Sequence, residues 1–407
     1  MSRLRGQGHQ AYLVGGAVRD LLLGGHPKDF DIATDATPED VHALFRNSRI
    51  IGRRFRIVHV RFGREIIEVT TFRGHHDESD DTQRGDGNRS RQSASGQLLR
   101  DNVYGTLEED AVRRDLTVNA IYYDAGNFEV FDHVGGLQDL QARRIRVIGD
   151  PEQRYTEDPV RMLRVLRFAA KLQFSVEEET AAAIPRCAHL LGHIPPARLF
   201  DEFLKLFLAG YAETTLDHLI RHELLAYLFP ATAANLARDA SGLALITAAM
   251  RNTDQRVAND KPVTPAFILA ALLWPVVSEQ ARQLEAGGEP PMVAMHIASQ
   301  QATSEAIQHI TIPRRFSQPM HEIWEFQLRL ANRRGRKAAE LPDHRRFRAA
   351  YDFLLLREEA GEDTGDLAAW WTPFQELPLE ERLQQAGSGG AGKGRRRPRK
   401  RRNPSTT

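Results

Sequence analysis

One stretch near the start of the chain constrains the fold more than any other, residues 11–34, AYLVGGAVRDLLLGGHPKDFDIAT. Its apolar beginning predicts a strand over residues 11–14, and AVRDLLLG predicts a helix that stops at Gly24 and Gly25. DFDIA predicts a second strand. Strand, helix and strand in so short a segment indicate an α/β domain.

Two aspartates, Asp29 and Asp31, stand one residue apart in the second predicted strand. Because residues i and i+2 of a strand point to one face, we expect both carboxylates side by side, with Phe30 packed on the other face. Adjacent carboxylates repel unless a cation lies between them, and their oxygens suit Mg²⁺, which completes its shell with phosphates and water. Alone, the pair is better explained as two carboxylates at a solvated strand edge.

A glycine pair, Gly15 and Gly16, separates the first strand from the helix. Without side chains, their N–H groups can approach an anion at the positive end of the helix. Arg19, in the first helical turn, can point back at the same anion, although a tight turn with a solvated Arg19 is the simpler alternative. A phosphate cradle followed by a carboxylate pair predicts a site for a metal-bound triphosphate and a reaction at phosphorus.

Further along, the pattern changes from mixed to helical. Thr37 is the expected N-cap of a helix, and residues 56–72 read as a hairpin around Gly63, followed by a polar, mobile loop over 73–100. After residue 150 the pattern is helical almost to residue 360. The apolar run 265–277 is too short to span a membrane and predicts a buried helix that ends near Pro275.

Charge is distributed unevenly in the 407 residues. The net charge of +1 combines a balance of +8 in residues 381–407 with −7 in the rest. The tail cannot bury a core, so we expect it to be disordered and either to bind the phosphates of a nucleic acid or to act as a solubility tail. The candidate RNA-binding residues are Arg395, Arg396, Arg397, Arg399, Lys400, Arg401 and Arg402. A single cysteine, Cys187, excludes a disulfide framework and indicates a cytoplasmic protein.

Four ordered segments then point to a known family: 13–24 (LVGGAVRDLLLG), 28–34 (KDFDIAT), 113–124 (RRDLTVNAIYYD) and 157–172 (EDPVRMLRVLRFAAKL). They resemble the signature of the DNA polymerase β superfamily of nucleotidyltransferases, in the bacterial class that contains CCA-adding enzymes and poly(A) polymerases. Other stretches are similar to the poly(A) polymerase branch, namely 50–63, 65–76, 98–115, 194–211 and the Arg-rich tail. That branch usually carries an N-terminal extension before the first strand.

The resemblance implies roles for particular residues. Asp29 and Asp31 would be metal ligands, and Asp115 would complete the catalytic acidic site. Glu68 is the other candidate for the third carboxylate, and strand alternation alone does not distinguish it from Asp115. The resemblance also implies nucleotide contacts by Gly15, Gly16, Arg19, Arg114, Asp158, Arg161 and Arg164.

The helix that begins near Pro159 supports this on physical grounds. Arg161, Arg164 and Arg167 recur at i, i+3 and i+6 and therefore share a face. Asp158 and Arg161 offer an acceptor and a donor for a base edge. The alternative is an exposed helix stabilised by a salt bridge between Glu157 and Arg161.

Together these features predict an α+β protein: a nucleotidyltransferase head (1–150), a helical neck for base recognition and RNA binding (151–230), a helical RNA-binding body (231–380) and the basic tail (381–407). The resemblance implies a poly(A) polymerase that uses Mg²⁺, or Mn²⁺, to transfer AMP from ATP to RNA 3′ ends. It also implies a role in RNA decay, with RNA chaperones or decay proteins as partners. The alternatives are a CCA-adding enzyme, distinguished by incorporation of CTP, and a non-catalytic RNA-binding protein, which would need a broken acidic cluster.

Overall fold

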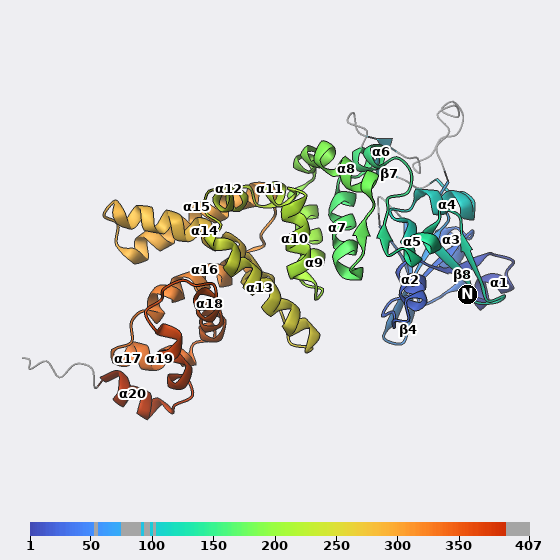
Figure 1. The fold of residues 1–407 in the computed structure, drawn as a ribbon. Coiled ribbons are helices and arrows are strands. Elements are labelled where there is room, and N and C mark those ends of the chain that lie inside the picture. The colour runs from blue at the N-terminus through green and yellow to red at the C-terminus, as the bar shows by residue number, and fades with distance from the viewer. Residues whose placement is uncertain (53–55, 75–90, 93–97, 101–102, 388–407) are drawn as a thin grey trace, which may run out of the picture. The chain divides into compact units, whose positions relative to one another are not determined.

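The computed structural model describes residues 1–52, 56–74, 91–92, 98–100 and 103–387 (Figure 1). They form two compact units, each built from discontinuous segments. The first comprises residues 1–234, 250–264 and 304–312, and the second the remaining segments 235–249, 265–303 and 313–407. Within the described residues, no helix has the length and apolar character needed to cross a membrane.

A seven-stranded mixed sheet in the order β3-β4-β5-β2-β1-β8-β9 organises the N-terminal part of the first unit. Its strands are β1 (Ala11–Val14), β2 (Asp31–Thr34), β3 (Ser48–Ile51), β4 (Ile57–Phe62), β5 (Glu65–Thr71), β8 (Ile121–Asp124) and β9 (Glu129–Asp132). β2 and β5 run parallel, and the other neighbours run antiparallel. The central β2 therefore joins two antiparallel groups of strands.

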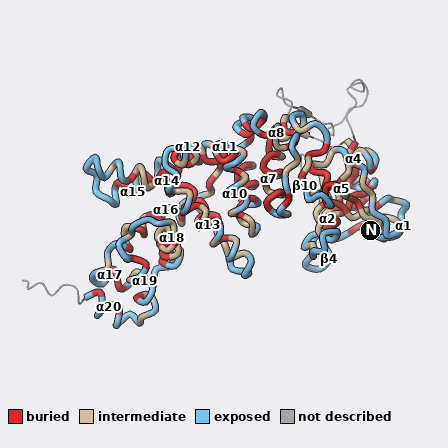
Figure 2. The backbone as a smooth tube through the Cα atoms, in the orientation of Figure 1, coloured by how far each residue is buried: buried red, intermediate tan, exposed pale blue. Residues whose placement is uncertain are grey.

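The two faces of this sheet are packed differently. One face is buried against α1 (Ser2–Gly6) and α3 (Pro38–Leu44), in a cluster formed by Leu4, Ala11, Ile32, Ala36, Val41, Phe45, Val58, Val60 and Val69. The other face is covered in part by α4 (Leu107–Arg113), in a cluster formed by Val14, Ala33, Phe72, Leu107, Ala111 and Tyr122. Figure 2 shows these buried segments within the head. Residues of β2 with the parity of Asp31 point to the partly covered face.

Local signals in the head formed as the sequence predicts. Thr37 caps α3 and forms a capping box with Asp40. Gly63 adopts a φ of 62° in the turn between β4 and β5, as the predicted hairpin requires. The helix α2 (Gly16–Leu22) ends before Gly24, whose φ is 76°.

The rest of the first unit is mainly helical. It contains α5 (Gly136–Gln141), α6 (Pro151–Glu157), α7 (Val160–Leu172), α8 (Glu178–Cys187), α9 (Pro196–Phe207), α10 (Ala212–Arg221), α11 (Leu225–Leu228) and most of α12 (Pro230–Arg238). Short 3-10 turns cover Thr117–Asn119 and Ala188–His193, and β10 (Arg144–Ile145) pairs with β11 (Ser175–Val176). The ends of α13 (Ser241–Ala258) and α15 (Pro291–His309) also belong to this unit.

The second unit is helical throughout its described residues. Its other elements are α14 (Pro265–Ala286), α16 (Arg314–Leu330), α17 (Gly335–Glu340), a 3-10 turn (Leu341–Asp343), α18 (Phe347–Glu359), α19 (Leu367–Phe374) and α20 (Leu379–Gly387). An aromatic core that includes Phe326, Phe347 and Trp371 joins α16, α18 and α19. This mixed-sheet head with a helical body confirms the predicted fold class.

The prediction that a helix ends near Pro275 was wrong, because α14 continues to Ala286. A proline inside a helix removes one hydrogen bond and needs room for its ring. Gly242 provides that room, since a Cβ there would lie only 2.6 Å from Pro275 Cγ. Burial of the surrounding residues, from Ile268 to Val277, stabilises the continuous helix.

Two segments predicted to be irregular, the loop over 73–100 and the tail over 381–407, contain regular structure in part. Residues Arg91–Gln92 (β6) and Leu98–Arg100 (β7) pair as strands within the predicted loop, while 75–90 and 93–97 lie outside the described residues. Residues 381–387 belong to α20 and are not part of a structureless tail. The candidate RNA-binding residues 395–402 lie outside the described residues.

Candidate active site

The carboxylates near Asp31 come from two parallel strands and one loop. Asp31 on β2 pairs in register with Glu68 on β5, so both side chains point to the same face. Burial, the charge of Glu68 and, to a smaller extent, the charge of Asp29 raise the pKa of Asp31, whereas Arg114 opposes them. Three carboxylates thus share a region in which their mutual repulsion is only partly compensated.

The geometry expected for Asp29 differs in one respect. β2 begins at Asp31, so Asp29 lies in the preceding loop and not on the strand. Phe30 is 39% exposed, and the prediction that it packs into the interior was wrong. The short strand leaves both residues before Asp31 without a ladder partner, because β5 and β1 pair only from Asp31 onward. The interaction of Asp29 with Asp31 therefore depends on the loop.

Asp115 lies in a different environment. Its Oδ2 is 2.5 Å from Arg164 on α7, and its Oδ1 accepts a hydrogen bond from the backbone N–H of Leu116 at 2.8 Å. Burial acts to raise the pKa of Asp115, but Arg164, Asn119 and the Leu116 N–H outweigh it and lower the pKa to about 2. Asp115 is thus an anion held by Arg164 of α7.

The glycine pair lies beneath two guanidinium groups. Gly15 has a φ of 77°, and a Cβ on it would lie 3.7 Å from an Arg114 nitrogen. A Cβ on Gly16 would lie 3.5 Å from an Arg19 nitrogen. The N–H of Gly15 donates to Ile121 O at 3.3 Å, so the contribution of Gly15 is its positive φ and lack of a side chain. Two cations beside bare backbone form a suitable environment for phosphate oxygens.

Arg19 and Arg114 are both held firmly. Arg19 is 1% exposed, forms an ion pair with Asp20 at 2.6 Å and donates to Asn119 Oδ1, so the alternative of a solvated Arg19 was wrong. Burial acts to lower the pKa of Arg114, but Asp110 and Tyr122 outweigh it and raise the pKa. Fixed guanidinium groups can bind phosphate oxygens with little loss of side-chain entropy.

The start of α7 carries unsatisfied polar atoms. Asp158 Oδ2 accepts from Arg198 at 2.7 Å, while the other carboxylate oxygen, Oδ1, is buried without a hydrogen-bond partner in the described structure. Arg164 Nε is likewise a buried donor without a hydrogen-bond partner in the described structure. A buried polar atom without a partner is costly, so an acceptor and a donor left in this state are suited to a ligand that supplies both partners.

Arg161 forms the ion pair with Glu157 that the alternative interpretation of this helix predicts. Its guanidinium lies 2.8 Å from Glu157, at i, i+4, and donates to Arg154 O at 2.7 Å. The two side chains are only 12% and 17% exposed, so this is not a solvated helix surface. The arginines of α7 reach different partners, since Arg164 contacts Asp115 and Arg167 lies 3.9 Å from Glu202.

Two residues that sequence reasoning missed connect these parts. Arg154 donates to the carbonyl oxygens of Arg113 and Arg114 at 2.8 and 2.6 Å, and burial together with Arg161 lowers its pKa to about 10. Asn119 contacts both Arg19 and Asp115. Asn119 lies in the quoted segment 113–124, but nothing in its spacing indicated a bridging role.

A metal fits this site only together with other ligands. Within the described part of the chain, no three His, Cys, Asp or Glu side chains are arranged to hold a metal ion by themselves. The repulsion on Asp31 nevertheless favours a bound cation. Mg²⁺ commonly takes one or two carboxylates and completes its shell with substrate phosphates and water, so the donor set is of the appropriate kind.

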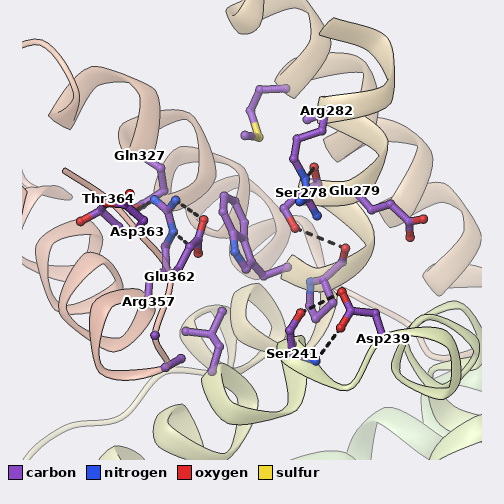
Figure 3. Close-up of a pocket in the computed structure, with 18 of the residues that line it drawn as sticks. Asp239, Ser241, Ser278, Glu279, Arg282, Gln327, Arg357, Glu362, Asp363 and Thr364 are labelled. Carbon is purple, nitrogen blue, oxygen red and sulfur yellow. Dashed lines mark hydrogen bonds and ion pairs between the residues drawn. The ribbon is translucent and has the colours of Figure 1, made fainter. Parts of the chain in front are cut away.

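A cavity of about 560 Å³ lies elsewhere, entirely among residues of the second unit (Figure 3). Two pairs of its charged side chains bind each other: Arg357 binds Glu362 at 2.6 Å, and Arg238 binds Glu279 at 2.9 Å. None of the carboxylates around Asp31 lines it. The size of this cavity therefore does not make it a better candidate active site than the region around Asp31.

Comparisons with known proteins agree with this geometry. A family model described as the poly A polymerase head domain matches residues 11–146. Models described as a probable RNA and SrmB-binding site of polymerase A and as the polymerase A arginine-rich C-terminus match 173–236 and 287–404. Poly(A) polymerase I of Salmonella typhimurium is 47% identical over 408 residues, which cover 98% of this chain and 87% of that protein. The chain belongs to the bacterial poly(A) polymerase family.

Similarity to CCA-adding enzymes is more restricted in sequence. The CCA-adding enzyme of Bacillus pumilus is 41% identical over 221 residues, 54% of this chain and 52% of that protein. The crystal structure of the Bacillus stearothermophilus CCA-adding enzyme in complex with CTP has a TM-score of 0.62 at 26% identity, over 94% of this chain and 80% of that chain. The fold is thus shared with CCA-adding enzymes, while similarity along almost the whole sequence is to poly(A) polymerase I. This confirms the predicted family and enzyme class.

Proposed function

We propose that this member of the poly(A) polymerase family transfers AMP from ATP to the 3′-hydroxyl of RNA and releases pyrophosphate. The observation that carries the proposal is the arrangement around Asp31. The charges of Glu68 and Asp29 raise the pKa of Asp31, and Arg114, which also lies beside Gly15, lowers it. A metal-binding carboxylate group and a phosphate cradle are thus adjacent.

Asp29, Asp31 and Glu68, together with oxygens of the triphosphate and water, are the proposed ligands of Mg²⁺. Its chemistry there would be to lower the pKa of the 3′-hydroxyl and to neutralise charge on the triphosphate. The register of β2 and β5 favours Glu68 over Asp115 as the third carboxylate, because Asp115 is already neutralised by Arg164. This differs from the role for Asp115 that the family resemblance implied.

The arginines of the site are proposed to bind the nucleotide. Arg19 and Arg114 hold the phosphates beside Gly15 and Gly16. Arg164, fixed by Asp115, and the buried Asp158 Oδ1 offer a donor and an acceptor to the base. Arg161 contributes by holding this helix start in place through Glu157 and Arg154.

The reaction is an in-line displacement at the α-phosphorus. The 3′-oxygen forms the new bond, the bond between the α-phosphorus and the bridging oxygen breaks, and pyrophosphate leaves. The hydroxyl proton passes to solvent. The protein contributes mainly positioning and electrostatic stabilisation, since phosphoryl-type transfer requires little covalent chemistry from side chains.

The test is extension of a 5′-labelled RNA by the purified protein with each nucleoside triphosphate in turn. We expect long products with ATP and Mg²⁺, and none with Asp31→Asn, which keeps the shape of the side chain but removes its charge. Glu65→Gln, an exposed position on the same strand as Glu68, is the matched control and should be active. Addition of only CTP and a terminal AMP to tRNA would instead establish a CCA-adding enzyme.

A further inference from the structure

We propose that the open part of the sheet beside Glu68 binds the phosphates of single-stranded RNA just upstream of its 3′ end, through Arg49 and Arg61. The inference rests on the proposed function, because that function requires an RNA 3′-hydroxyl near Asp31. It assigns a binding surface to β3 and β4.

A row of directly paired residues crosses four strands. Arg49 on β3 pairs with His59 on β4, His59 with Glu68 on β5, and Glu68 with Asp31 on β2. Directly paired residues point to the same face. The contact of 3.1 Å between His59 Nε2 and Glu68 Oε1 agrees with this direction. Because neighbouring strands are about 4.8 Å apart, the backbone of Arg49 lies roughly 10 Å from that of Glu68.

The same face carries a second arginine. Arg61 follows His59 by two residues and pairs across β4 and β5 with Ile66, which is 53% exposed. Arg61 Nε donates to Gly63 O at 3.0 Å, which directs its side chain along the turn of the hairpin. Alternate residues of these strands, including Val58 and Val60, are buried in the core on the opposite face.

Among the described residues, these two arginines have no carboxylate partner. Both residues are exposed, and within the described part of the chain neither Arg49 nor Arg61 forms an ion pair with a carboxylate. Arginines elsewhere in the head do so, for example Arg114 with Asp110 and Arg146 with Asp139. An exposed pair of cations beside an aliphatic side chain suits the phosphates and sugar of an RNA strand.

Sheet order indicates the direction of the RNA. β1, which leads into the glycine cradle, lies on one side of β2, and β5, β4 and β3 lie on the other. The triphosphate is proposed to lie on the β1 side. Since the attacking and leaving oxygens are roughly in line on opposite sides of the phosphorus, the RNA should approach from the β5 side. Arg49 and Arg61 lie along that approach.

The main competing explanation is electrostatic. The two arginines could simply offset the carboxylates of Glu68 and its neighbours, without touching RNA. In that case their removal would change the Mg²⁺ requirement and leave RNA affinity unaltered. RNA binding by the two arginines thus predicts a change in RNA affinity, whereas charge compensation predicts a change in the Mg²⁺ requirement.

The test compares the double variant Arg49→Gln/Arg61→Gln with Arg144→Gln, which removes an exposed arginine from β10 of the same unit. Binding of a fluorescent, 3′-deoxy oligoadenylate too short to reach a distant tail is measured by anisotropy at several salt concentrations. Because the double variant cannot bind these two phosphates, the plot of the logarithm of the binding constant against the logarithm of the salt concentration should become less steep by about 1.4. The affinity at 0.1 M salt should fall by roughly 25-fold. The KM for ATP and the melting temperature should be unchanged.

Equal affinities and salt slopes for the double variant and Arg144→Gln would overturn the proposal, as would a change confined to the Mg²⁺ requirement. Binding of a 3′-deoxy RNA does not depend on chemistry. Failure of the wild-type protein to extend normal RNA would therefore count against the proposed function, whereas normal extension with an unchanged RNA affinity of the double variant would count against the RNA surface alone.

Discussion

The roles of Glu68 and Asp115 can be separated by two isosteric changes, Glu68→Gln and Asp115→Asn. Asp115 is a buried carboxylate whose side chain is 14% exposed and whose pKa is lowered from 3.8 to about 2. At roughly 1.36 kcal/mol per pKa unit, this difference stabilises the folded protein by about 2 kcal/mol at neutral pH. Asp115→Asn should remove that stabilisation.

The pH dependence follows from the sign of the shift. A carboxylate whose pKa is lower in the folded protein stabilises it above the unfolded pKa, and this stabilisation is lost as pH falls toward the folded pKa. The difference in unfolding free energy between wild type and Asp115→Asn should therefore be full at pH 7 and about half as large at pH 3. Urea unfolding followed by circular dichroism measures it at each pH.

Glu68→Gln should behave in the opposite way. The Glu68 side chain is 46% exposed and adds to the repulsion on Asp31, so we expect a change in unfolding free energy within about 0.5 kcal/mol. Loss of a metal ligand should instead reduce kcat by roughly 100- to 1,000-fold, as for other groups that stabilise transition-state charge, and raise the Mg²⁺ requirement. Asp115→Asn should chiefly raise the KM for ATP, because Arg164 loses its anchor.

Adenylation kinetics over a range of Mg²⁺ concentrations, with Glu65→Gln as control, give the decisive comparison. The assignment of Glu68 is refuted if Glu68→Gln retains kcat while Asp115→Asn stays stable and loses kcat. That result would return the third place to Asp115, as the family resemblance implied.

Three further predictions concern other parts of the chain. Arg161→Ala should raise the KM for ATP and reduce the preference for ATP over CTP, with a loss of about 2–3 kcal/mol of transition-state stabilisation in steady-state kinetics; unchanged kinetics with both nucleotides would make the helix purely structural. Deleting residues 388–407 should leave addition to a saturating short RNA unchanged but flatten the salt dependence of long-RNA binding, by about 0.7 in slope per phosphate contact; equal slopes would indicate a solubility tail. Gly242→Ala should destabilise the protein by about 1–3 kcal/mol through contact with Pro275, visible as a lower melting temperature; an unchanged melting temperature would show that α14 shifts without cost.

Features encoded by neighbouring residues were predictable from the sequence. The cap at Thr37 and the turn at Gly63 depend on side-chain chemistry and φ preferences within a few residues, and both formed as expected. Glu157 and Arg161 are four residues apart on helical turns, so their ion pair could also be anticipated.

Features that depend on distant pairing were not predictable in the same way. The alignment of Asp31 with Glu68 requires β2 and β5 to be parallel neighbours, and the contact of Asp115 with Arg164 requires α7 to pack beside the segment after α4. Local rules also fail where packing outweighs them. Pro275 remains inside a helix because Gly242 leaves room for its ring and the run around it is buried.

Because each unit is built from discontinuous segments of the chain, the positions at which chimeras of this family can be joined are limited. Residues 250–264 and 304–312, far along the sequence, belong to the unit that contains the candidate active site. Asp254 accepts hydrogen bonds from the N–H groups of Ala212 and Glu213, and Thr311 N–H donates to Pro196 O. A chimera that joins this head and neck to the C-terminal half of a CCA-adding enzyme near residue 230 would replace these contacts. Grafts between the two enzyme types should therefore keep both returning segments with the parent that supplies the neck.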